Sequence, residues 1–370
     1  MICVLFGAGA EQGFGLSGGE DFARKVLGLD ASSLNDAIED HYKELLKNEG
    51  DNWYPNFVNT NWKTETLLKA ALSKKYLDES FDTKTEYESK IKNEIKETEN
   101  DTVFQNNIID SYSSYMGIID GIFHTLINPK VLGPKRFWRV VICYSRAYAY
   151  LIGKMCQPET VSKDLYYRIL SDWAFTKETM RNFADLHKSD ESYYSIIKEY
   201  SDIKVVTTNY TNLCETISGI KEDDIAYVHG KFGWFESPKE LTTYDAFNEP
   251  LPSTLVFPYI FIQSGIKPIV DHRQLAEYSK MLKFVDEADA IFVLGYRINL
   301  DDNHINSILK TAALKGKKLI YFDFDDLEKT VILRRLRLKD CSNLRVVKIN
   351  ADNSFENFER ELKKQCKNKN

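Results

Sequence analysis

The sequence has no pair of cysteines in C-x-x-C spacing. Its six cysteines are scattered along 370 residues, at positions 3, 143, 156, 214, 341 and 366. Neither a zinc ribbon nor a dithiol redox motif is compatible with this spacing. Cys3 and Cys143 lie in apolar runs, where a cysteine usually serves as a small core side chain. We therefore expect no metal site.

A long uncharged hydrophobic run is also missing. The longest apolar stretch, residues 131–155, contains five cations, which are Lys135, Arg136, Arg139, Arg146 and Lys154. A membrane-spanning helix would not carry so many charges through its centre. The first residues run directly into an apolar pattern, so we expect no signal peptide. The net charge of −6 gives no general attraction to nucleic acid or to anionic membranes. We expect a cytoplasmic protein that binds neither.

Short apolar runs rich in β-branched residues occur at the start of the chain and after residue 201. They are Ile2–Phe6, Ile203–Thr207, Ile225–Val228, Ala290–Leu294, Lys318–Phe324 and Leu344–Ile349. Helical patterns separate several of them, as at Gln274–Glu287 and Ile305–Lys315. This alternation predicts an α/β fold, a Rossmann-like doubly wound sheet of parallel strands.

Between the first and second strands the sequence changes character. Apolar residues recur at helical spacing, as in Leu34, Ile38 and Tyr42, and strand signals are few. The spacing predicts a large all-helical insertion. The predicted division is a sheet domain of residues 1–30 and 202–350, a helical insertion of residues 31–201, and a C-terminal helix and tail of residues 351–370.

A glycine-rich loop follows the first strand. Residues 7–19 include six glycines. Glycines let the backbone approach a phosphate closely, and a following helix offers free N–H groups at its positive end. The glycines do not match the strict G-x-G-x-x-G spacing, so a plain turn between a core strand and a helix is an equal alternative.

Polar residues follow two later strands. Thr208-Asn209 comes after the second strand, and an asparagine there can donate and accept hydrogen bonds to a carboxamide. The alternative is that Thr211 or Asn209 caps the next helix. His229-Gly230 comes after the third strand, where the glycine leaves the imidazole uncovered. Histidine is the side chain best suited to accept a proton near neutral pH.

Two further strands end in small or acidic residues. Gly295 follows the fourth predicted strand, and Asp323 lies at the end of the fifth. An aspartate at the ligand edge of such a sheet can accept hydrogen bonds from ribose hydroxyls. For Asp301 and Asp302 a helix N-cap is the favoured alternative.

In this order, Gly7-Ala8-Gly9, Thr208-Asn209, His229-Gly230 and Leu294-Gly295 resemble the sirtuin family. More narrowly, they resemble the sirtuin-like NAD-cleaving (NADase) effectors of bacterial antiphage defence. The resemblance covers residues 1–25 and about 202–350, and Glu11 departs from it because a serine is usual there. It implies Asn209 and His229 as catalytic residues. The cofactor-binding residues that it implies are Gly7, Ala8, Gly9, Phe22, Thr208, Gly295 and Asp323.

The activity implied by the resemblance is hydrolysis of NAD+ to nicotinamide and ADP-ribose, with NAD as the substrate. NAD-dependent lysine deacylation is an alternative, but the chain has no cysteine from 230 to 340 for the zinc module of protein deacylases. A non-catalytic nucleotide-binding or assembly module is a third reading. The family analogy also implies a regulated homo-oligomer and, in some systems, a HerA-type ATPase partner.

Overall fold

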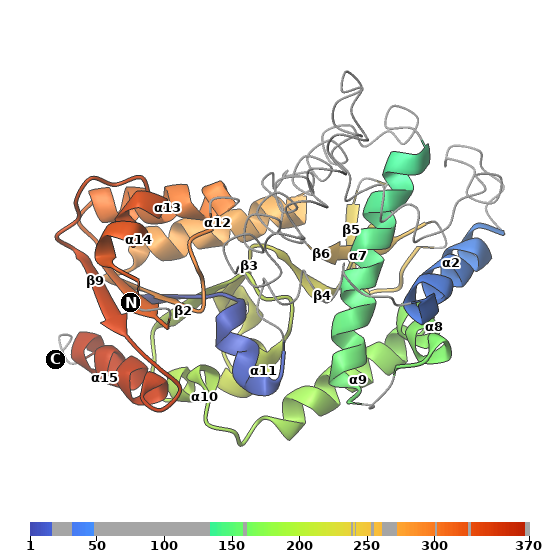
Figure 1. The fold of residues 1–370 in the computed structure, drawn as a ribbon, viewed down its shortest axis with the longest axis horizontal. Helices are drawn as coiled ribbons and strands as arrows, with labels where there is room; N and C mark the ends of the chain where they lie inside the picture. Colours follow the sequence, from blue (N-terminus) through green and yellow to red (C-terminus); the bar gives the residue numbers. More distant parts are fainter. Residues whose placement is uncertain are drawn as a thin grey trace, which may run out of the picture.

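The computed structural model describes residues 1–16, 32–47, 134–157, 161–237, 240, 242–252, 255–260, 272–299, 302–324 and 327–366. Figure 1 shows two sheets in this part of the chain, flanked by helices. No helix among the described residues has the length and apolar character needed to cross a bilayer.

The larger sheet has six strands, all from the regions predicted to form strands. They are β1 (Ile2–Phe6), β2 (Ile203–Thr207), β3 (Ile225–Tyr227), β7 (Ala290–Leu294), β8 (Lys318–Asp323) and β9 (Leu344–Lys348). The order is β3-β2-β1-β7-β8-β9, and each neighbouring pair is parallel. Numbered within this sheet the order is 3-2-1-4-5-6, the doubly wound arrangement of dinucleotide-binding folds. The predicted fold class is confirmed.

Both faces of this sheet are buried, which explains why its strands are continuously apolar. In β1, Val4 and Phe6 face one hydrophobic core, whereas Cys3 and Leu5 face another. The helices α12 (His272–Glu287), α13 (Asn303–Leu314) and α14 (Lys329–Arg335) cover the Cys3 face. The opposite face is covered by α10 (Tyr193–Lys198), α11 (Leu213–Ser218) and α15 (Ser354–Cys366). Figure 1 shows these two helical layers on either side of the strands.

All the regular secondary structure that is described between β1 and β2 is helical. Besides α10, this segment forms α2 (Ser32–Lys47), α7 (Pro134–Met155), α8 (Lys163–Ser171) and α9 (Trp173–Leu186). Local side chains fix where these helices begin, because Ser162 and Asp172 accept hydrogen bonds from the first turns of α8 and α9. A capping box at Ser192 begins α10.

A second, antiparallel sheet was not anticipated. It consists of β4 (Gly230–Ser237), β5 (Thr242–Asp245) and β6 (Phe257–Ile260), in the order β5-β4-β6. Tyr148 of α7 packs edge-on against Phe232 of β4, and Trp173 packs against Phe235 at 4.3 Å between ring centroids. The helical segment therefore shares its core with both sheets. The division into domains remains a prediction.

Candidate functional site

The strand order reverses between β1 and β7, and ligands of doubly wound folds bind beside the carboxyl ends of the strands at such a point. The two loops that leave these strands are in direct contact. Gly7 N–H donates to the Leu294 carbonyl at 2.9 Å, and Gly9 N–H donates to the Gly295 carbonyl at 3.0 Å. A Cβ on Gly7 would lie 2.4 Å from the Gly295 oxygen. Part of the glycine signal thus reflects loop packing, and the Gly7 and Gly9 amides are already engaged.

Asn209 joins β2 to this point. Its Nδ2 donates to the Gly7 carbonyl at 3.2 Å and to the Tyr194 hydroxyl at 3.2 Å. Its backbone N–H donates to the Thr207 hydroxyl at 3.0 Å, and the residue is buried. Because both Nδ2 hydrogens are used within the protein, Oδ1 is the atom through which this amide would accept a hydrogen bond from a ligand.

A buried carboxyl group supports the asparagine. The hydroxyls of Tyr194 and Thr211 both donate to Glu11 Oε1, at 2.8 and 2.6 Å. Glu11 is only 4% exposed, and burial raises its pKa to about 7 although the hydrogen bonds oppose the shift. Sequence reasoning noticed Glu11 only as a departure from a family pattern. It missed Tyr194, which lies 183 positions away in sequence and comes into reach only when α10 packs on the sheet.

His229 lies between β3 and β4, at the strand ends where it was predicted. Gly230 fixes the chain direction here, because its φ is +87° and an added Cβ would lie 2.3 Å from the Tyr259 carbonyl oxygen. His229 Nε2 lies 3.2 Å from Asp302 Oδ1, with the two side chains 8% and 9% exposed. The ring of His304 is 5.5 Å from that of His229, between centroids.

Asp302 and His304 come from the start of α13, after the loop that leaves β7. Asp302 occupies the N-cap position, as expected, but makes no side-chain cap hydrogen bond and turns its carboxylate to His229. The loop is held by Asn306, whose Nδ2 donates to the Asn299 carbonyl at 2.6 Å and whose Oδ1 accepts from Tyr296 at 2.9 Å. Sequence reasoning did not connect Asp302 with His229, because the two residues lie far apart in the sequence and belong to different elements.

These three side chains are also a candidate ligand set for a metal ion. Each of His229, Asp302 and His304 offers one nitrogen or oxygen, and the three atoms lie within 4.8 Å of one another. Sequence reasoning expected no metal because it looked only for cysteine motifs. A set assembled from the β3–β4 junction and the start of α13 carries no such spacing signal.

The remaining predicted site residues are only partly placed. Asp323 is buried at the end of β8, where its carboxylate accepts a hydrogen bond from the backbone N–H of Leu327. Thr208 N–H donates to the Phe6 carbonyl at 3.0 Å. Phe22 lies outside the described residues. The nucleotide contacts expected of Gly7, Ala8, Gly9, Phe22, Thr208, Gly295 and Asp323 stay predictions.

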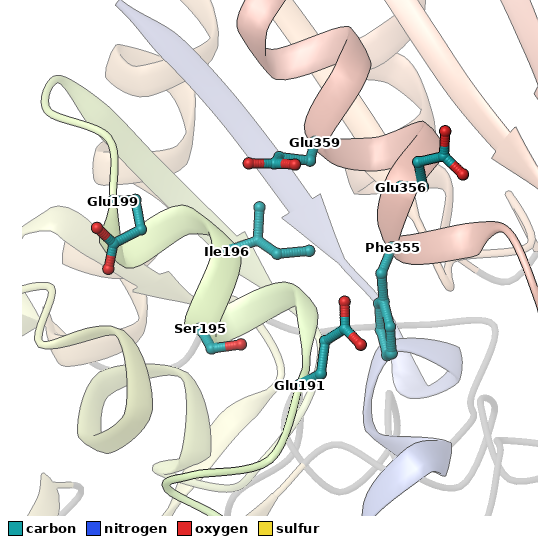
Figure 2. A pocket seen from close by; sticks show the side chains of 7 residues that line it. All are labelled: Glu191, Ser195, Ile196, Glu199, Phe355, Glu356 and Glu359. Atoms are coloured by element: carbon teal, nitrogen blue, oxygen red, sulfur yellow. The ribbon is translucent and has the colours of Figure 1, made fainter.

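A hollow of about 370 Å³ lies elsewhere, between α10 and α15. Figure 2 shows its lining, with one group of side chains on α10 or directly beside its two ends and another on α15. Four of the lining residues are glutamates: Glu191, Glu199, Glu356 and Glu359. So many carboxylates would repel the pyrophosphate of a dinucleotide, so we do not place the site there.

No family model and no curated protein matches the chain. Among solved structures it is similar to one described as "Structure of Sir2Tm bound to a propionylated peptide". The identity is 16%, the TM-score is 0.32, and the match covers 58% of this chain and 88% of that one. The fold class therefore rests on the strand order of the larger sheet and not on this likeness.

Proposed function

We propose that this chain is an NAD+ glycohydrolase that cleaves NAD+ to nicotinamide and ADP-ribose. One observation carries the proposal. Asn209 and His229, the pair named by the sequence resemblance, follow neighbouring parallel strands of a doubly wound sheet, and Asn209 is hydrogen-bonded to the glycine loop at Gly7. This is the edge at which such sheets bind nucleotides.

The reaction needs little help at its leaving group. Nicotinamide departs from the anomeric carbon as a neutral molecule, taking the bonding electron pair onto its ring nitrogen. The costly species is the positively charged sugar, which a positioned water must trap. We assign Asn209 Oδ1 to hold that water or a ribose hydroxyl through an accepted hydrogen bond.

His229 is assigned the role of general base. Its Nε2 faces the Asp302 carboxylate at 3.2 Å, so Nδ1 is the nitrogen that takes the proton of the attacking water. The new C–O bond replaces the broken C–N bond, and the proton is held on the imidazole. The Asp302 carboxylate stabilises the imidazolium that forms, as an opposite charge at this distance does in a buried site.

We further propose that the activity is restrained until infection, because unrestrained NAD cleavage would harm the host cell. The sequence resemblance supports this antiphage role in the cytoplasm, together with homo-oligomerisation and a HerA-type ATPase partner. Cells that carry the chain should lose NAD after phage challenge, and cells carrying Asn209→Ala should keep it.

The defining test incubates purified protein with NAD and follows nicotinamide release, with and without an acylated lysine peptide. Release that is independent of peptide supports the glycohydrolase. Strict dependence on the peptide would instead identify a deacylase. Tight NAD binding with no release under either condition would favour a non-catalytic nucleotide-binding module. His272→Ala, at an exposed position, serves as a control for nonspecific effects of histidine removal.

A further inference from the structure

We propose that His229, Asp302 and His304 bind a divalent transition-metal ion of the zinc class. Two imidazoles and one carboxylate converge here, with their ligand atoms within 4.8 Å of one another. His229 and Asp302 are buried. In the part of the chain that the structure describes, this is the one group of three such side chains that meets at ligand distance.

The spacing of the first two ligand atoms suits such an ion. Zinc binds imidazole nitrogen and carboxylate oxygen at about 2.0–2.2 Å, so two tetrahedral ligand atoms lie roughly 3.4 Å apart. His229 Nε2 and Asp302 Oδ1 are 3.2 Å apart. No two atoms on one such ion can be more than about 4.4 Å apart. The 4.8 Å limit therefore leaves at most a small rotation of the His304 ring to close the site.

The ligands sit on elements that hold them in place. His229 is fixed by the left-handed turn at Gly230. Asp302 and His304 begin α13, and Asp302 N–H donates to the Asn299 carbonyl at 3.1 Å. The His304 ring also packs edge-on against Tyr278 of α12, with centroids 5.3 Å apart. Support of this kind around the ligands is typical of metal sites.

The donor set selects the class of ion. Calcium and magnesium take oxygen ligands, whereas two imidazoles with one carboxylate suit zinc, iron or a related transition metal. Three protein ligands leave an open coordination position. A small ligand such as water would take that position.

The test measures zinc binding to the full chain after treatment with a chelator, by calorimetry with zinc alone. We expect one zinc per chain for the wild type. His304→Ala and Asp302→Asn should each weaken binding by more than the roughly 10–100-fold typical of losing an outer-shell partner. His187→Ala is the matched control, because His187 pairs with Asp190 at 2.6 Å and has no third ligand assigned beside it. Its zinc affinity should be unchanged.

Cobalt provides a second readout that does not depend on activity. Cobalt bound in place of zinc should give the visible absorption of a four-coordinate site, and His304→Gln should abolish that signal while circular dichroism shows a folded chain. Wild-type protein that binds no zinc, or folded His304 and Asp302 variants that bind it as tightly as the wild type, would overturn the proposal.

The two proposals fail in different ways. Zinc binding without nicotinamide release, in both metal-free and loaded protein, would leave the metal site standing and remove the glycohydrolase. Nicotinamide release without zinc binding would do the reverse.

Discussion

Two polar clusters lie at the carboxyl ends of the strands of the larger sheet, and they are built differently. The asparagine cluster consists of Glu11, Tyr194, Asn209 and Thr211, joined by hydrogen bonds of 2.6–3.2 Å. The histidine cluster consists of His229, Asp302 and His304, which converge as potential ligands. In the asparagine cluster, each hydrogen-bond donor has an acceptor within the protein. In the second, the groups are suited to exchange a proton or to bind an ion.

The difference indicates a division of labour. Hydrogen bonds from both Nδ2 hydrogens hold the Asn209 amide in one orientation, which is what a positioning residue needs. His229 instead faces a carboxylate that can stabilise its charged form. We therefore expect changes in the asparagine cluster to act through stability and position, and changes in the histidine cluster to act through chemistry.

The largest expected effect is on turnover. His229→Ala should lower kcat for nicotinamide release by about 10²–10⁴-fold, because it removes the proposed general base, while NAD affinity falls little. Steady-state kinetics with calorimetric NAD binding measures both. A comparable loss of NAD affinity would show that His229 binds the substrate and would contradict the proposed division between positioning and chemistry.

The next effect concerns pH. The pKa of Glu11 is raised by burial to about 7, so the folded state holds this proton more tightly than the unfolded chain does. The stabilisation is complete below the ordinary glutamate pKa and is lost as the pH rises through about 7. Glu11→Gln mimics the protonated carboxyl, so between about pH 5 and pH 8 the wild type should lose of the order of 3 kcal/mol relative to the variant. Urea unfolding of both at several pH values tests this, and parallel profiles would contradict it.

A smaller effect tests whether the loops that follow β1 and β7 need glycine at position 295 in order to pack together. Gly295 has φ +68°, and an added Cβ would meet Ala10 N at 2.3 Å. Gly295→Ala should lower the free energy of unfolding by about 2 kcal/mol. Gly13→Ala is the control, since nothing lies within 4 Å of its added Cβ. Equal stability of the two variants by thermal unfolding would show that the loops do not need this close contact.

The smallest effect should come from the link between Asn209 and Glu11. Tyr194→Phe removes one hydroxyl that accepts from Asn209 and donates to Glu11, at a cost of about 1 kcal/mol in stability. Nicotinamide release should fall by less than in Asn209→Ala. An activity loss as large as that of Asn209→Ala would place Tyr194 in the chemistry instead.

The sheet was predictable because parallel strands buried on both faces are recognisable as short apolar runs. The runs at Ile2–Phe6, Ile203–Thr207 and Ala290–Leu294 match their strands residue for residue. The antiparallel sheet was not predicted, because β5 and β6 have only four residues each and because glycine, proline and charged residues interrupt the apolar pattern of its strands.

The positions of Asn209 and His229 were predictable because each residue follows a strand directly, whereas their catalytic roles stay predictions. Their partners could not be inferred, since Tyr194 reaches Glu11 through the packing of a helix and Asp302 reaches His229 through a loop. Part of the glycine pattern also has a cause other than nucleotide binding. Gly7 and Gly295 are needed for contact between two loops, whatever ligand binds beside them.

The most direct test of the central claim is nicotinamide release from NAD alone by three folded proteins: the wild type, Asn209→Ala and His229→Ala. We predict release by the wild type and loss of it in both variants, with all three equally folded by circular dichroism. Release that continues unchanged in both variants would show that the cleavage site lies elsewhere and would contradict the account.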